Sequence, residues 1–100
     1  MNSTLKFLEK IAGPLTVAML FRAYRKSNDM TLEDMASLLD VSKGFVSNIE
    51  NNRKKLSLDK TLEFAAKMKE SKEFYAVVWF EDQARESGLN FAKIAKMKVA

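Results

Sequence analysis

Five times in this sequence, a Ser or Thr stands directly before a segment whose apolar residues recur at helical spacing. A hydroxyl at this place accepts a hydrogen bond from a free backbone N–H group of the first helical turn, so it marks where a helix begins. The pattern predicts helices from Thr16 to about Lys26, Leu32–Leu39, Lys43–Glu50, from Ser57 to about Glu70 and from Ser71 to about Ser87. A chain of 100 residues organised in this way is expected to be one small, mainly α-helical domain.

The two ends of the chain follow different patterns. Residues 1–13 carry apolar positions at helical spacing before Gly13-Pro14, and they predict a short helical arm. In the tail the apolar residues alternate with polar ones, which is typical of a β-strand; the alternating positions are Leu89, Phe91, Ala95, Met97 and Val99. Since a lone strand has no partner in its own chain, we expect it to pair with a second copy or with another protein.

The sequence contains no His, no Cys and only three Gly. His is the commonest general base, His and Cys are preferred zinc ligands, and glycine-rich loops hold nucleotide phosphates. We therefore expect no catalytic residue, no metal, no cofactor and no enzymatic activity. Because no apolar run approaches the ~20 residues that cross a bilayer, and no signal-peptide pattern opens the chain, we expect a cytoplasmic protein without a membrane partner.

Positive charge is concentrated in the middle of the chain and in its tail, residues 89–100. The net charge is +4, and residues 42–60 carry five basic against two acidic side chains. Such a cluster is found on solvated surfaces as well as at nucleic-acid sites. The order of the helices around the cluster favours the second interpretation.

The predicted helices Leu32–Leu39 and Lys43–Glu50 are short and are joined by a tight turn at Asp40-Val41. Ala36 lies where the two helices should cross, and its small side chain lets the backbones approach. This is the spacing of a helix-turn-helix, in which the second helix enters the DNA major groove. An ordinary helical hairpin in a small bundle is the alternative.

The outward positions of the second of these helices carry short or polar side chains. Asn can bond adenine and Lys can donate to guanine, so these positions suit the reading of base edges. The predicted base-reading residues are Lys43, Gly44, Ser47 and Asn48. The predicted phosphate-binding residues, at the two ends of the helix and in a basic loop, Arg53–Leu56, are Ser42, Asn51, Arg53, Lys54 and Lys55.

The stretch YRKSNDMTLEDMASLLDVSKGFVSNIENNRK makes residues 16–70 resemble the phage-repressor and Cro-type helix-turn-helix family, also called the xenobiotic-response-element family. The resemblance implies an ion pair between Arg25, late in the first helix, and Glu50, at the end of the recognition helix. The sequence departs from the family at Leu32, where Gln is usual, and at Asp40, where Gly is usual. Both departures are expected to weaken DNA binding more than the fold.

A further similarity runs through SLDKTLEFAAKMKESKEFYAVVWFEDQARESGLNF to a subgroup of proteobacterial regulators, several of them antitoxin-like. Together these features predict an all-α, five-helix Cro/repressor-type bundle with an N-terminal helical arm and a C-terminal β-strand. The expected divisions are the arm at 1–13, the helix-turn-helix domain at 14–70, and a helix and strand at 71–100 for dimerisation or partner binding.

The helix that follows Ser71 is apolar almost all round. A helix in a small domain needs only one apolar stripe, so we expect a surplus face that contacts a partner; a fully buried core helix is the alternative. The predicted interface residues of this helix and the tail are Phe74, Tyr75, Val78, Trp79, Phe91 and Met97.

The expected function is sequence-specific, DNA-binding regulation of transcription, as a repressor that binds a palindromic operator as a homodimer. One alternative is an antitoxin that binds a toxin and represses its own operon. Another is a protein-interaction module that keeps the helix-turn-helix scaffold without binding DNA.

Overall fold

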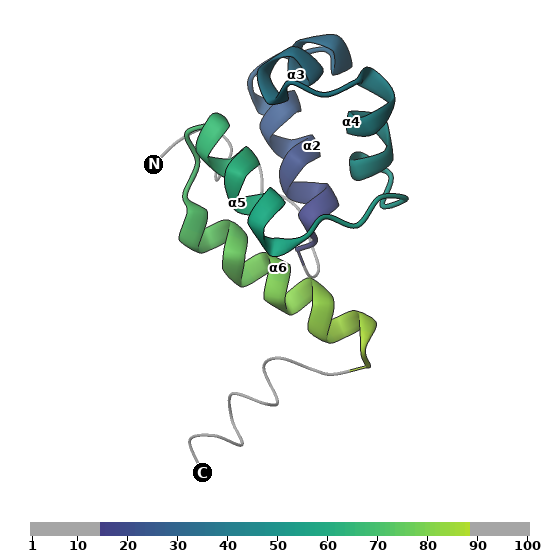
Figure 1. Ribbon diagram of the computed structural model, residues 1–100, viewed down its shortest axis with the longest axis vertical. Helices are drawn as coiled ribbons and strands as arrows, with labels where there is room; N and C mark the ends of the chain where they lie inside the picture. Colours follow the sequence, from purple (N-terminus) through teal and green to yellow (C-terminus); the bar gives the residue numbers. More distant parts are fainter. Residues whose placement is uncertain (1–14, 89–100) are drawn as a thin grey trace.

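The computed structural model describes residues 15–88, and it consists of five α-helices (Figure 1). They are α2 (Val17–Ser27), α3 (Leu32–Leu39), α4 (Lys43–Glu50), α5 (Leu58–Lys67) and α6 (Lys72–Glu86). The described range contains no β-strand. The all-α prediction is confirmed for this range, whereas the predicted arm and the predicted strand, with Phe91 and Met97, lie outside it.

Each helix begins where a side-chain hydroxyl was expected to cap it. The hydroxyl of the N-cap residue accepts a hydrogen bond from the third backbone N–H of its helix in all five cases, from Thr16, Thr31, Ser42, Ser57 and Ser71. At α3 the Asp34 carboxylate also accepts from the Thr31 backbone N–H, 3.0 Å away, which completes a capping box. The helix starts are therefore fixed by local hydrogen bonds.

Each helix is followed by a residue in the left-handed conformation. Four of these residues are not glycine: Asp29, Asp40, Asn52 and Lys69 have φ between 54° and 59°. Asp and Asn tolerate this conformation better than most residues, which suits Asp40 and Asn52. The Lys69 turn was not predicted, and it ends α5 at Lys67 rather than near Glu70.

The core lies where α2 crosses the middle of the molecule, between the α3–α4 pair and the α5–α6 pair (Figure 1). Phe21 of α2 is fully buried, and the rings of Phe64 in α5 and Tyr75 in α6 meet it edge to face, each at 6.0 Å between ring centroids. Val46 and Ile49 bury the inner side of α4 against this core. Within the described residues, α4 is therefore packed along one side.

Helix α6 places its residues differently from the sequence interpretation. Tyr75 and Val78, predicted at a partner interface, are each only 1% exposed and belong to the core. They are buried because α6 packs across both α2 and α5. The apolar side chains that α6 leaves exposed are Val77 (53%) and Phe80 (49%), which the prediction did not include.

Polar contacts also attach α6 to the segments around it. The Trp79 indole Nε1 donates to the Leu56 carbonyl oxygen at 2.8 Å. The Asp82 carboxylate accepts from the backbone N–H of Val17 at 2.9 Å, at the positive N-terminus of α2. The Arg85 guanidinium donates to the carbonyl oxygen of Leu15. The position of α6 is therefore tied both to the start of α2 and to the segment before α5.

The Arg25–Glu50 ion pair implied by the family resemblance is present and bidentate. Arg25 Nε lies 2.8 Å from Glu50 Oε2, and Nη2 lies 3.0 Å from Oε1. Arg25 Nη1 also donates to the Met30 carbonyl oxygen at 3.1 Å. The side chains are 15% and 4% exposed, respectively, so the pair is largely shielded from water. It joins the end of α4 to the end of α2.

Replacing Glu50 by Ala should destabilise the protein by ~3–5 kcal/mol, because it leaves the Arg25 guanidinium largely buried without its carboxylate. Urea denaturation followed by circular dichroism measures this loss. The paired variant Arg25→Met with Glu50→Leu should recover much of it, since no unpaired charge then remains. Equal stability of Glu50→Ala and the wild type would contradict a structural role for the pair.

The Tyr75 hydroxyl is buried and has no hydrogen-bond partner within residues 15–88. Burial raises the pKa of this hydroxyl above its ordinary value, and the nearby Glu70 carboxylate adds to the shift. An unpaired buried hydroxyl costs stability of ~1–3 kcal/mol. Tyr75→Phe should therefore leave the melting temperature unchanged or raise it. A lower melting temperature of this variant would mean that the hydroxyl makes a stabilising hydrogen bond.

The same substitution should change the response to alkali. The unfolded chain releases the tyrosine proton near its ordinary pKa of about 10, while the folded chain still holds it. Stability should consequently fall as the pH rises above that value, and the Phe variant should fall less steeply. Denaturation midpoints measured at a series of alkaline pH values test this. Partial burial also raises the pKa of Tyr24, so Tyr24→Phe is the comparison and should reduce the alkaline slope less than Tyr75→Phe.

Candidate nucleic-acid interface

Helices α3 and α4 form the two arms of a helix-turn-helix. The turn between them contains Asp40 in the left-handed conformation, and the Val41 backbone N–H donates to the Ala36 carbonyl oxygen at 3.0 Å. Ala36 itself is buried, which allows the close packing that its small side chain predicted. The turn places α4 beside α2, and within residues 15–88 only Val46, Ile49 and Glu50 of this helix are buried (Figure 1).

The predicted base-reading residues lie on the outer side of α4, away from its buried residues. Lys43, Gly44 and Asn48 are exposed, and Ser47 is partly exposed. The space around Gly44 is open, since a Cβ there would meet only the Ser42 hydroxyl, at 4.0 Å. No contact within the described residues thus requires glycine at this position.

The polar side chains of α4 differ in how free they are. The Asn51 side-chain amide donates to the Ser47 carbonyl oxygen at 2.8 Å and to its hydroxyl at 3.3 Å, so it is engaged at the end of the helix. The Ser42 hydroxyl accepts from the Phe45 N–H. The Asn48 side chain makes no hydrogen bond to any other described residue, and its amide is available to a ligand.

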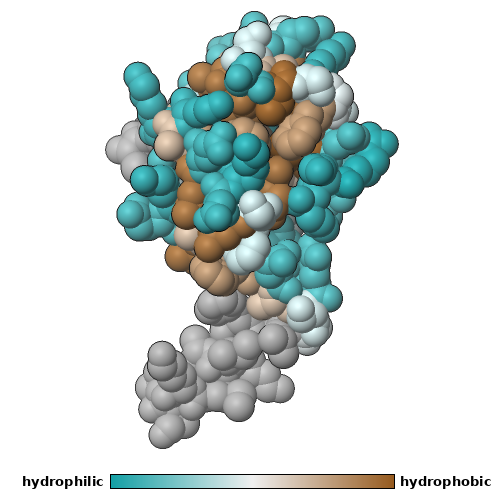
Figure 2. Space-filling view, viewed as in Figure 1, coloured by the Kyte–Doolittle hydropathy of each residue, from teal (hydrophilic) through white to brown (hydrophobic). Residues whose placement is uncertain are grey.

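The basic loop, Arg53–Leu56, follows α4 closely. The backbone N–H groups of Arg53 and Lys54 both donate to the Asn48 carbonyl oxygen, at 2.8 Å and 3.1 Å. These bonds bring the side chains of the loop next to the outer side of the recognition helix. In Figure 2 hydrophilic side chains cover the right-hand side of the molecule, where Figure 1 places α4, and they also lie along the left edge and across the front.

The three cations of the loop have different surroundings. The Lys54 ammonium lies 5.6 Å from the centroid of the Phe45 ring, a cation–π contact. The Lys55 ammonium donates to the Asn52 side-chain oxygen at 2.9 Å and pairs with Glu86 at the end of α6. Arg53 is exposed and forms no ion pair in the part of the chain that the structure describes.

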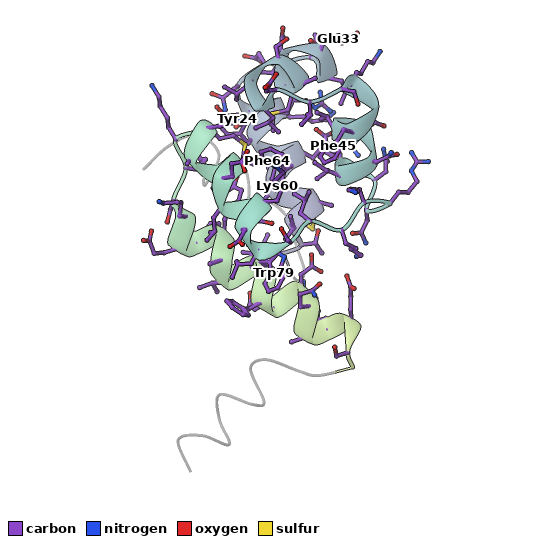
Figure 3. All side chains as sticks on the ribbon, viewed as in Figure 1. Tyr24, Glu33, Phe45, Lys60, Phe64 and Trp79 are labelled. Atoms are coloured by element: carbon purple, nitrogen blue, oxygen red, sulfur yellow. The ribbon has the colours of Figure 1, made fainter. Side chains whose placement is uncertain are left out.

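Sequence reasoning missed three residues of this surface. Phe45 packs edge to face on Phe64, with 6.3 Å between ring centroids, and the two side chains point toward each other in Figure 3. Glu33 pairs with Lys43 at 3.1 Å. Glu86, at the end of α6, pairs with Lys55. The Lys55–Glu86 contact joins residues 31 positions apart, so no local sequence pattern could indicate it.

The two departures from the family pattern also have a place in the structure. Leu32 is partly buried and packs against the core, so the position usually held by Gln here serves packing. Asp40 has φ 59° and ψ 48° and is exposed in the turn. Its carboxylate adds negative charge near the start of α4.

Besides this surface, the described residues form a shallow groove of about 420 Å³ between α5 and α6, lined in part by Leu62, Glu63 and Ala76. They contain no group of three or more His, Cys, Asp or Glu placed to hold a metal. Within the same range, no helix is long and apolar enough to cross a bilayer. A hollow beneath the basic loop, lined in part by Ile49, Leu56 and Trp79, has a volume of about 20 Å³, room for a single water.

Comparison with known proteins agrees with this geometry. A family model described as helix-turn-helix matches residues 21–74, more than half of the chain and all of α3, α4 and α5. No curated protein and no solved structure matches the chain. The matched range, the turn at Asp40 and the exposed side of α4 together mean that the chain belongs to the Cro/C1-type helix-turn-helix family of DNA-binding regulators.

Proposed function

We propose that the protein is a sequence-specific repressor that inserts α4 into the DNA major groove. The observation that carries this proposal is the outer side of α4, which is polar and exposed and has a basic loop beside it. Major-groove recognition requires a helix of this kind, held from behind and flanked by phosphate-binding cations. Binding to an operator would block transcription.

In this proposal, bases are read from α4 and phosphates are held at its ends. Asn48 would bond adenine through its free amide, and Lys43 would donate to guanine acceptors. Gly44 and Ser47 would allow close approach of the helix to the base edges. Ser42, Asn51, Arg53, Lys54 and Lys55 would face the phosphates, with the unpaired Arg53 as the strongest of these contacts.

We also propose that two copies bind together through α6. Val77 and Phe80 leave an exposed apolar pair on this helix, and the packing of α6 on α2 would fix the distance between two recognition helices. Two-fold symmetry then calls for a palindromic operator whose half-sites lie about 34–36 Å apart.

Selection of bound sequences from a random duplex pool tests the proposal directly. A repressor of this kind should enrich one palindromic sequence with a spacing of about one helical turn. Binding that is steeply dependent on salt but enriches no sequence would remove the claim of specificity. Absence of duplex binding at any ionic strength would favour a protein-interaction module on the same scaffold.

Asn48→Ala should weaken binding to the selected operator by ~1–3 kcal/mol and relax the preference at one base position. Arg53→Ala is the matched comparison, because it should weaken all duplexes alike and lower the salt slope by ~1. Titrations of the operator and of a scrambled duplex measure both. An equal loss on the two duplexes for Asn48→Ala would contradict a base-reading role.

Phe80→Ser should shift the protein from dimer to monomer in sedimentation equilibrium. Because Phe80 is half exposed, the melting temperature of the monomer should change little. Gln83→Ser, an exposed change on the same helix, serves as the control. If Phe80→Ser leaves the sedimentation unchanged, α6 does not form the interface.

A further inference from the structure

Two lysines of the proposed DNA surface are held by carboxylates from other helices. Lys43 is the first residue of α4, and its ammonium lies 3.1 Å from Glu33 Oε2. Lys55 lies beyond the other end of α4, and its ammonium pairs with Glu86 while donating to the Asn52 side-chain oxygen. Each end of the recognition helix therefore has one lysine that is already paired.

Glu33 lies near the N-terminus of its helix, and Glu86 lies at the C-terminus of its helix. Glu33 is in the first turn of α3, where the helix dipole favours a negative charge. The hydrogen bond from its own backbone N–H, followed by the contact with Lys43, holds the pKa of Glu33 below its ordinary value. Figure 3 shows Glu33 at the outer end of α3, far from Trp79 on α6.

Glu86 is in the last turn of α6, where the helix already carries partial negative charge. Its position is unfavourable within its own helix, and the contact with Lys55 compensates for this. The Lys55 and Glu86 side chains are 49% and 43% exposed. Such a pair is screened by water and opens at low cost, so an incoming anion can replace the carboxylate.

A DNA phosphate presents the same kind of partner as a carboxylate, namely anionic oxygens that accept from an ammonium. We infer that Glu33 and Glu86 set the DNA affinity of this protein by occupying Lys43 and Lys55 until DNA displaces them. This inference rests on the proposed DNA-binding function and adds two residues that do not themselves contact DNA. They are positioning residues, which act through the lysines that they hold.

Glu86→Gln in the full chain is the main test, with a random-sequence duplex as the probe. It should tighten binding about two- to five-fold at low ionic strength, the worth of an exposed ion pair. The gain should shrink as salt is added, because the pair is itself screened. Glu63→Gln is the matched control, since it removes the same charge and frees Lys60 and Lys67 on α5.

A Lys55→Ala background separates the pairing from the general charge of the protein. In that background Glu86→Gln should have no more effect than Glu63→Gln, because the lysine that it releases is gone. Melting temperatures of all variants are expected to stay close to that of the wild type. An equal gain from Glu86→Gln and Glu63→Gln, or a Glu86→Gln gain that survives without Lys55, would overturn the inference.

Glu33→Gln tests the other end of α4 in the same way. If Lys43 reads a base, the gain should be larger on the selected operator than on the random duplex, and Lys43→Ala should abolish it. A wild-type chain that binds duplex with steep salt dependence, but responds to neither substitution, refutes this inference alone. A wild-type chain that binds no duplex refutes the proposed function, and the inference with it.

Discussion

The bidentate contact between Arg25 and Glu50 determines how α4 is presented. A helix of eight residues is not stable alone, so its orientation comes from what holds it. Val46 and Ile49 bury one side of α4, but apolar contacts are not directional and leave rotation about the helix axis poorly fixed. The planar guanidinium meets the carboxylate in a single geometry and fixes that rotation. With the rotation of α4 fixed in this way, Asn48 and Lys43 are exposed on the side of the helix that faces away from the core.

The parts of the fold that could be predicted from the sequence are those decided by near neighbours. Helix starts depend on a hydroxyl and an N–H three residues away, and α3 and α4 begin and end at the predicted residues. The tight turn at Asp40-Val41 could be predicted for the same reason. The end of α5 could not, because Lys69 has no intrinsic preference for the left-handed conformation and takes it where the chain must turn into α6.

The arrangement of α6 shows the limit of such reasoning. Its nearly continuous apolar sequence indicates burial on more than one side, but it does not say which residues meet α2 and α5. Tyr75 and Val78 turned out to fill the core, and Val77 and Phe80 remain outside. Trp79 lies between these two groups: its ring packs against the core, and its indole N–H donates to the Leu56 carbonyl oxygen. The contact of Glu86 with Lys55 likewise depends on where α6 crosses the molecule.

The pairing of Lys43 and Lys55 has a consequence for specificity. Binding to random DNA is almost wholly electrostatic, so each cation that is already paired reduces it. Contacts with base edges are lost only when the sequence is wrong, and pairing of a distant lysine leaves them intact. Because an operator complex makes the same phosphate contacts, Glu86 and the exposed Asp40 lower both affinities by the same factor. Glu33, which holds the base-reading Lys43, lowers the affinity for the operator more. A regulator must find its site among many competing ones, and the ratio of the two affinities decides whether it does. In this proposal Glu86 and Asp40 set the absolute affinity, whereas Glu33 also affects the ratio, through Lys43.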